Sequence, residues 1–499
     1  MNFTKGVGIV CAFQLLFLCT TAAQQITFEH SSQEVLLAIE HISSLRLVKA
    51  KQLLAEEAAK HPNNVACDYL NDCIDYYNLI TDPDPSLFNV LEKNKSQRIN
   101  RIQKLAATSP YKLYAEAEIH LHWSILKLYK HDYVSGAVEL REAYQLLEKN
   151  NKLFPSFLPT KKSLGFIKAL LGTLPDNYAW ILNIVGLKGD YNEGIKLIQQ
   201  FLIQKKIPDE QLLDKQQADF YFTLLNFYFG SKQTAWEYCE PITQDYTSNL
   251  LSCYLRTFIA ARTAHSDEAI ACLNKRPRSS EYASFDELDY LIGYTKLNRL
   301  DNDGDIFLKK FVTFGHNNSL KKDAYRRLAW HHLIANDTAK YQIYKSLSYK
   351  QNAAKDDEDK IVDKDLQKGI YPHIGILKAR LLFDGGYYEQ AERMMSEINT
   401  SRFKGNHHAA EYYYRFGRIM QEQKKYSKAI EYFTQSIRLA EPLQYYMAPY
   451  SALQIGYINL KLGYVQTAKY YFEKAMTYKN YDAKNYIHQK ANHALREIK

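Results

Sequence analysis

Two segments near the C-terminal end of the chain repeat one pattern of small and bulky residues. Each copy has a bulky residue followed by glycine, an alanine twelve residues after the glycine, and a phenylalanine four residues after the alanine. The copies, 39 residues apart, comprise Phe416, Gly417, Ala429 and Phe433, and then Ile455, Gly456, Ala468 and Phe472. Small residues at this spacing let two helices cross closely while the phenylalanine ring fills the groove beside the crossing. The pattern therefore predicts a pair of antiparallel helices in each copy.

A weaker signal marks the start of the second helix of such a pair elsewhere in the chain. A tyrosine followed three residues later by alanine or glycine occurs at Tyr133, Tyr191, Tyr388 and Tyr426. The stretches between these positions carry apolar residues at helical spacing, without sustained strand-like alternation. Repeated helix pairs with this spacing of small residues are typical of the tetratricopeptide repeat. We therefore expect an all-α fold, an α-solenoid of tetratricopeptide-like helical hairpins in which neighbours cover each other's apolar faces.

The length of the chain and one charged segment indicate how the array is divided. The chain has 499 residues, more than a single compact core holds. Residues 351–368 are rich in interleaved lysine and aspartate and contain few apolar residues, as exposed connecting segments do. We expect a divergent helical-repeat array over residues 24–350, a charged loop or linker over 351–368, and a tetratricopeptide-repeat array over 369–499. Its last segment, Asp482–Lys499, is expected to be an amphipathic capping helix.

Residues 1–23 have the order of a secretory signal peptide. Lys5 precedes the mostly apolar segment Gly6–Cys19, and small residues follow before Gln24. The apolar run is shorter than the roughly 20 residues of a membrane span, so a membrane anchor is the weaker alternative. We expect export to the periplasm or cell envelope, with secretion as the alternative, and no transmembrane segment in the mature chain.

Charge and motif content exclude several classes of function. The net charge is +9, and one positive charge leaves with residues 1–23, but lysine and arginine are interleaved with acids. Nucleic-acid binding requires a basic stripe, so we predict no nucleic-acid partner. Histidines within the expected helices lack the four-residue spacing of paired metal ligands. They are His120, His122, His331, His332, His488 and His493. Because phosphate-binding loops and nucleophile motifs are also lacking, we predict no catalytic residue, no metal and no cofactor.

Five cysteines follow the expected signal peptide, an odd number that rules out a complete disulfide framework. Cys67 and Cys73 lie too far apart on one straight helix to be bridged. Cys253 and Cys272 fall on the two helices of one expected hairpin. Two interpretations stay open for this pair: a disulfide in an oxidising compartment, or two buried small hydrophobic residues.

Residues 164–202 contain a distinctive series of small residues. The series consists of Leu164-Gly165, Leu174-Pro175, Leu182 with Gly186, Gly189-Asp190 and Gly194. This stretch resembles a divergent eukaryotic family of tetratricopeptide-repeat proteins linked to inclusion-body clearance and lipid droplets. The resemblance implies a shared fold built on close helix packing, and it points to lipid as one class of ligand. The signal peptide and Tyr191, where a basic residue is expected, depart from that family, so we expect an exported bacterial relative.

A helical-repeat array without catalytic motifs usually binds other molecules. We therefore expect a non-enzymatic scaffold or adaptor that binds a protein or peptide along its concave face. Tyrosine provides large contact area at low entropic cost. The contacts predicted in the C-terminal array are Tyr412, Arg415, Tyr445, Tyr450 and Asn459. The alternatives are a carrier of a lipid or other apolar small molecule, using the apolar segment Phe166–Leu187, and a glycan-uptake component that uses aromatic surfaces.

Overall fold

The structure is a computed structural model that describes residues 25–174, 180, 186, 189–351, 371–403, 406–443, 445–479, 481 and 484–498. Within these residues the chain is helical, and the extended contacts amount to one isolated bridge between Thr27 and Asn64. The predicted all-α fold is confirmed. The expected signal peptide and nearly all of the charged segment 351–368 lie outside the described residues. Within the described part of the chain, no helix combines the length and apolar character needed to cross a membrane.

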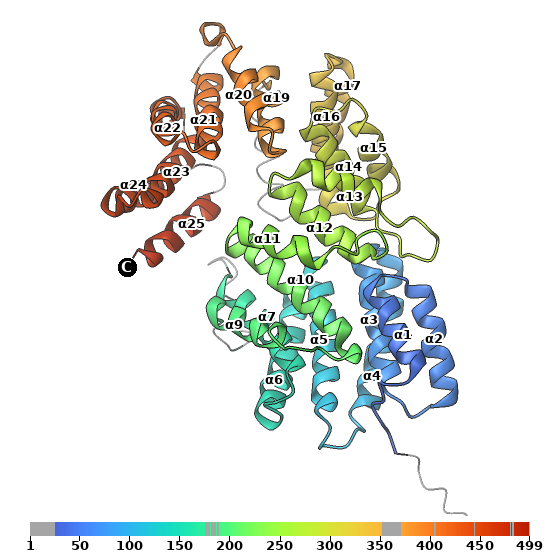
Figure 1. Cartoon of the computed structure of the whole chain (residues 1–499). Coiled ribbons are helices and arrows are strands. Elements are labelled where there is room, and N and C mark those ends of the chain that lie inside the picture. Colours follow the sequence, from blue (N-terminus) through green and yellow to red (C-terminus); the bar gives the residue numbers. More distant parts are fainter. Residues whose placement is uncertain are drawn as a thin grey trace, which may run out of the picture.

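The helices form antiparallel pairs, in which we call the first helix A and the second helix B (Figure 1). The early pairs are α1 (Gln33–Ser43) with α2 (Leu47–Lys60), α3 (Ala66–Thr81) with α4 (Pro85–Ile102), α5 (Pro110–Tyr129) with α6 (Tyr133–Leu153), α7 (Pro159–Gly172) with α9 (Tyr191–Leu202), and α10 (Leu212–Phe229) with α11 (Lys232–Ile242). The middle pairs are α12 (Leu250–Arg262) with α13 (Ser266–Asn274), α14 (Glu287–Asn298) with α15 (Gly304–Phe314), and α16 (Asn318–Ile334) with α17 (Thr338–Lys350). The last pairs are α19 (Ile374–Asp384) with α20 (Tyr388–Ser396), α21 (Asn406–Glu422) with α22 (Tyr426–Ala440), and α23 (Met447–Lys461) with α24 (Val465–Thr477), followed by α25 (Lys484–Glu497).

Most described turns between helix A and helix B share one backbone geometry. One turn residue has positive φ in eight of them: Leu45, His131, Ala264, Leu300, Asn336, Gly386, Lys424 and Gly463. The next residue then donates its N–H to the carbonyl five positions earlier, at 2.8 Å from Arg46 to His41 and 2.9 Å from Tyr464 to Asn459. This is the Schellman motif, which satisfies the last carbonyls of a helix. It reverses the chain within a few residues and so fixes the position at which helix B begins.

In the last helix pairs, helix A and helix B approach closely where a glycine faces a phenylalanine. A Cβ added to Gly417 would lie 2.7 Å from the ring of Phe433, and one added to Gly456 would lie 2.6 Å from the ring of Phe472. Both rings are fully buried, as are Ala429 and Ala468. A side chain at either glycine would displace a ring that has no space to move, because protein interiors are close-packed.

The hairpin of α7 and α9 is closer still, because glycines meet backbone rather than side chains. A Cβ on Gly165 would lie 2.6 Å from the carbonyl oxygen of Gly194, and a Cβ on Gly194 would lie 2.4 Å from that of Gly165. Gly165 and Gly194, two of the small residues that carry the family resemblance, therefore lie at a helix–helix contact. The segment that joins the two helices lies largely outside the described residues.

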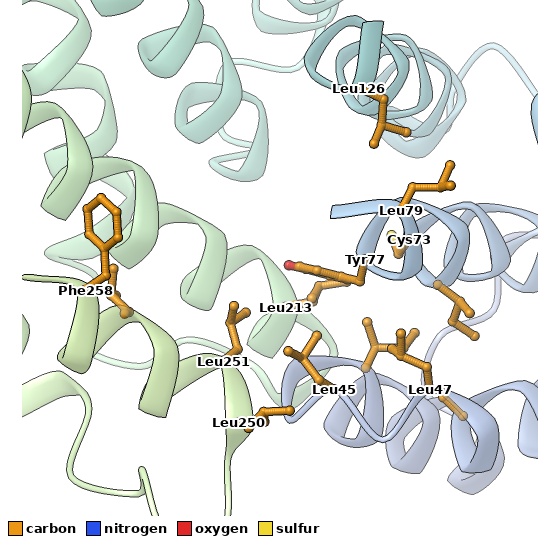
Figure 2. Packing of buried hydrophobic residues seen from close by; sticks show 14 of the residues in the cluster. Leu45, Leu47, Cys73, Tyr77, Leu79, Leu126, Leu213, Leu250, Leu251 and Phe258 are labelled. Carbon is orange, nitrogen blue, oxygen red and sulfur yellow. The ribbon is translucent and has the colours of Figure 1, made fainter. Parts of the chain in front are cut away.

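The early helices depart from a simple stack in which each pair contacts only its neighbours. The turn after α1 is buried against α10 and α12, as Figure 2 shows for Leu45 beside Leu213, Leu250 and Leu251. Its backbone also bonds distant residues, since the carbonyl of Leu45 accepts from the N–H of Ala283 at 2.8 Å. The first hairpin is thus part of a core that runs from α1 to α16.

Packing continues from the middle helices into the last ones. Leu297 of α14, Leu333 of α16 and Leu381 of α19 share one buried cluster. The chain end is covered by α25, whose residues Ile487 and Ala491 are buried in the cluster formed by the last helices. Helix α19 therefore packs on α14 and α16 even though the connecting segment lies outside the described residues.

The described cysteines are all buried and unbonded. The sulfur atoms of Cys253 on α12 and Cys272 on α13 are 3.5 Å apart. This separation exceeds the ~2.05 Å of a disulfide bond, yet the two side chains already face each other. The structure therefore places the predicted pair side by side as thiols.

The close crossing of α21 and α22 gives a test of the repeat register. Replacing Ala429 with leucine inserts three carbon atoms at a fully buried position and should cost about 1–3 kcal/mol through overpacking. In a repeat array the damage stays near the altered repeat. Hydrogen exchange should therefore show lost protection mainly in α21–α25. Equal loss along the whole chain would contradict the repeat architecture, and an unchanged profile would contradict the register.

Candidate functional site

Basic side chains line the face formed by successive A helices. Arginines come from α12, α16, α19 and α21, and they are Arg262, Arg326, Arg327, Arg380, Arg415 and Arg418. Five of these side chains are 9–26% exposed, so they lie at the boundary between protein and solvent. Each guanidinium also has a buried nitrogen without a hydrogen-bond partner. We call these six residues the arginine row.

Aromatic rings hold the arginine row in place. The guanidinium carbon of Arg327 lies 3.8 Å from the ring centre of Tyr294, and that of Arg418 lies 5.0 Å from the ring centre of Phe383. Arg326 and Arg380 flank one indole, at 4.8 Å and 4.9 Å from Trp330. Stacking of this kind fixes a guanidinium plane but leaves its N–H edge able to donate.

Asp323 of α16 anchors the middle of the row. It accepts from Nε of Arg327 at 2.5 Å and from the hydroxyl of Tyr290 at 2.6 Å, and it pairs with Arg326. Burial opposes ionisation of Asp323, but the charges of Arg327 and Arg326 outweigh it and hold the pKa of Asp323 well below its ordinary value. Asp323 therefore stays ionised and fixes the two arginines.

The remaining arginines have more distant acids. Nε of Arg380 is 4.0 Å from Asp384, and Nε of Arg415 is 3.6 Å from Glu411. Burial and the nearby positive charge of Arg415 lower the pKa of Arg380. Positive charge on this part of the row is thus only partly balanced by carboxylates.

The row faces basic residues on other helices. Desolvation lowers the pKa of Lys232 on α11, and the positive charges of Arg418 on α21 and Lys490 on α25 lower it further. These charges act across the space between α11 and the last helices, which curve toward each other in Figure 1. Basic side chains of α11, α21 and α25 therefore lie near one another on this side of the superhelix.

A cavity of about 100 Å³ opens beside the arginine row. Its walls come from α16, α17, the residues before α19, α21 and the start of α23. Basic and aromatic side chains dominate these walls, and they include Arg326, Lys345, Arg380, Trp330, Tyr341 and Tyr446. Glu411 is the carboxylate among the lining residues.

The predicted contact residues fall into two groups. Arg415 belongs to the arginine row and donates to the hydroxyl of Tyr446 at 3.3 Å. Tyr450 packs against the ring of Tyr486 in α25, with ring centres 6.0 Å apart. Tyr445 meets the ring of His407, which lines the cavity, at 4.6 Å. These three predicted residues lie along the row or beside the cavity.

The other two predicted contacts have structural roles. Tyr412 is 8% exposed and packs against Phe403 and Phe416 at the helix contact. The amide of Asn459 is buried and donates to the carbonyl of Ile455 one turn earlier. Neither side chain lies on the arginine row. Fewer positions of each helix A face outward than the sequence pattern predicts.

The structure also identifies residues that sequence analysis did not single out. Apart from Arg415, the arginine row was not predicted, because its members come from four separate helices and form no long basic run. Its sequence signal is an arginine or lysine on one face of successive A helices, readable once the helix register is known.

Two of the histidines considered from the sequence, His120 and His122, bond to carboxylates through Nδ1. His122 is fully buried, and its Nδ1 lies 2.8 Å from Asp72. One cluster within the described residues brings metal-ligand atoms within 4.8 Å of one another: Asp82, Asp286 and His316. The contact between His316 and Asp82, at 2.5 Å, is enough to explain why the ligand atoms of these residues lie close together.

Comparisons with known proteins extend the description only to the helical architecture. No protein-family profile matches the chain, and no curated protein does. Among solved structures, the human IFIT1 dimer with m7Gppp-AAAA is 14% identical, with a TM-score of 0.27 over 92% of this chain and 80% of that one. Yeast Tom70 is 13% identical, with a TM-score of 0.26 over 93% and 88%. The APC/C assembly Cut9–Hcn1 is 12% identical, with a TM-score of 0.25 over 92% and 89%. At such low scores the function must be argued from this chain's own residues.

The carboxylate of Asp323 should stabilise the arrangement of α14 and α16. Replacing Asp323 with asparagine removes a charged acceptor from two arginines and should lower the free energy of unfolding by about 1–3 kcal/mol at neutral pH. Because the folded-state pKa is depressed, this stabilisation is present above the ordinary aspartate pKa and is lost as the pH falls toward the folded value. Urea unfolding followed by tryptophan fluorescence should therefore show a smaller loss of stability on acidification for the variant than for the native chain. The matched control is Glu473→Gln on the exposed face of α24. Equal effects of the two substitutions would contradict the anchoring role.

Proposed function

We propose that this chain is a non-enzymatic scaffold that binds an acidic polypeptide segment along the enclosed face of its superhelix. The observation that carries the proposal is the arginine row, in which all six guanidinium groups have a buried nitrogen without an acceptor. The acids beside Arg380 and Arg415 lie at the limit of ion-pair distance, so a partner that carries negative charge can complete this surface. Carboxylates are suitable acceptors, because arginine binds them through paired N–H groups.

The spacing of the row suits an extended polypeptide. Successive A helices contact one another from α12 to α16 and from α19 to α23. Packed helices lie about 8–10 Å apart, and a polyproline II chain advances about 3.1 Å per residue with three residues per turn. Acidic side chains at every third position of such a chain lie on one face and would meet arginines of neighbouring helices.

The balance of charge favours a polypeptide over a nucleic acid. Asp323, Asp384, Glu411 and Glu422 each lie within 4.0 Å of an arginine of the row. These acids would repel a backbone that carries one phosphate per residue, but they leave room for sparse carboxylates. Tyrosines beside the row, such as Tyr450, supply apolar contact area for the partner's remaining side chains.

A lipid carrier is the second candidate, suggested by the apolar segment Phe166–Leu187. Its described residues Ile167, Ala169 and Leu171 are buried in the helix cores. They are therefore already engaged in packing, which favours the scaffold.

Peptide binding tests the scaffold. A fluorescent twelve-residue peptide with glutamate at every third position should bind the mature chain, measured by fluorescence anisotropy. Arg415→Ala combined with Arg418→Ala should weaken binding by about tenfold or more, because charge-assisted hydrogen bonds are lost. The control is Arg438→Ala on the exposed face of α22, which should leave affinity unchanged. Equal binding of a peptide with glutamine in place of glutamate would contradict the proposal, as would equal affinity of all variants.

We further propose that the scaffold works outside the cytosol, in the periplasm or cell envelope. This rests on the signal-peptide pattern of residues 1–23. Expression of the full chain in a bacterium, followed by fractionation and intact-mass measurement, should yield a periplasmic product that begins near Gln24. A cytosolic product that retains residues 1–23 would contradict this location.

A further inference from the structure

The cavity beside the arginine row is lined mainly by basic and aromatic side chains. It lies where α16 and α17 meet α19, α21 and the start of α23. Its volume of about 100 Å³ is below the ~150 Å³ of a cavity that holds one benzene molecule. The cavity therefore encloses one compact chemical group, and any larger ligand must extend from its mouth.

Two guanidinium groups that line this cavity also stack on one ring. Arg326 and Arg380 lie 4.8 Å and 4.9 Å from the ring centre of Trp330, and both line the cavity. Nε of each is buried and has no hydrogen-bond partner. The indole fixes both planes, so the two donors are held in place before any ligand arrives.

Charge around the cavity is unbalanced. The cationic side chains are Arg326, Arg327, Lys345, Arg380 and Arg415, and the carboxylates that pair with them or line the cavity are Asp323, Asp384 and Glu411. Two positive charges therefore remain uncompensated when all eight groups are ionised. The lowered pKa of Arg380, which arises from burial and from Arg415, is the expected effect of such an excess.

We propose that this cavity binds the phosphoryl group of a small phosphomonoester. A phosphomonoester carries a charge of about −1.5 to −2 at neutral pH and has three acceptor oxygens. Its charge matches the excess on the walls, and its oxygens can accept from Arg326 and Arg380 together. A carboxylate or sulfonate carries a single negative charge and would leave one positive charge unbalanced.

The walls also indicate what is attached to the phosphoryl group. Tyr341, Tyr446 and Met447 line the same cavity as the basic residues. Tyr446 is partly exposed, so its ring can contact a group that extends from the cavity mouth. Aromatic rings pack favourably against one another, so a small aryl phosphate should bind more tightly than inorganic phosphate. This proposal goes beyond polypeptide binding: Arg415 and Arg418 do not line the cavity, although Arg415 adds positive charge beside it.

Isothermal titration calorimetry of the mature chain tests the site with three probes: phenyl phosphate, inorganic phosphate and benzenesulfonate. We expect phenyl phosphate to bind about tenfold more tightly than benzenesulfonate, which has the same ring but a single charge. Inorganic phosphate should bind more weakly than phenyl phosphate because it lacks the ring. Equal affinity for phenyl phosphate and benzenesulfonate would overturn the proposal, as would no heat of binding from any probe.

Variants then locate the site. Arg380→Ala should weaken phenyl phosphate about tenfold or more, whereas Arg438→Ala on α22 should leave it unchanged. Arg380→Lys keeps the charge but loses the planar donor. Its affinity for phenyl phosphate should therefore lie between those of Arg380→Ala and Arg438→Ala. Circular dichroism of each variant establishes that the helices are intact. If Arg380→Ala is unfolded, Lys345→Gln takes its place, since Lys345 lines the cavity from α17 and is partly exposed. Full affinity in a folded Arg380→Ala or Lys345→Gln variant would overturn the assignment.

Discussion

The packing of a phenylalanine ring against a glycine is the contact on which the rest of the last helices depends. Gly417 leaves the space that the ring of Phe433 occupies, and Gly456 leaves the space for Phe472. Each ring holds helix B against helix A, and the turn between them is closed by a Schellman motif. The two features together fix the face that each helix A turns toward the inside of the superhelix. Side chains at equivalent positions of successive A helices therefore form a continuous surface.

That surface is costly in the absence of a partner. A buried donor without an acceptor costs about 1–3 kcal/mol, whereas stacking of a guanidinium on an aromatic ring returns about 0.5–2 kcal/mol. The arginine row contains six such donors, and its nearest acids are shared or lie at the limit of ion-pair distance. Side chains that lower stability in this way are expected at positions that are selected for binding rather than for folding. Both proposed ligands, carboxylates along the row and a phosphoryl group in the cavity, would bring negatively charged acceptors to these arginines.

The fold was predictable because its signals are local. A glycine, an alanine and a phenylalanine at fixed spacing define each crossing of two helices, and these residues lie within one hairpin. The turns were less predictable, because positive φ falls on residues such as Leu300 and Lys424, which carry no sequence preference for that conformation. Contact of the first turn with α10 and α12 was also beyond prediction, since it joins residues about two hundred positions apart. Long-range contacts of this kind leave no periodic pattern in the sequence.

The candidate site was predicted only in part, for a related reason. Arg415 was found because it lies in the clearest repeat, beside the tyrosines that drew attention to that helix. Arg326 and Arg380 were missed, since each lies in a helix of mixed charge without a long basic run, and their common relation to Trp330 exists only in three dimensions. Tyr412 was assigned to the surface although its ring is needed at the helix contact. Sequence spacing defines the helix, but neighbouring helices decide which of its faces remains open.

Anomalous X-ray diffraction from crystals of the mature chain soaked in bromide would test the central claim most directly. Bromide is a monatomic anion that reports where positive charge lacks a protein partner. We expect bromide ions in the cavity beside the guanidinium groups of Arg326 and Arg380, and further ions along Arg415 and Arg418. Bromide bound only at isolated surface lysines, with the arginines of the row fully bonded to protein carboxylates, would contradict it.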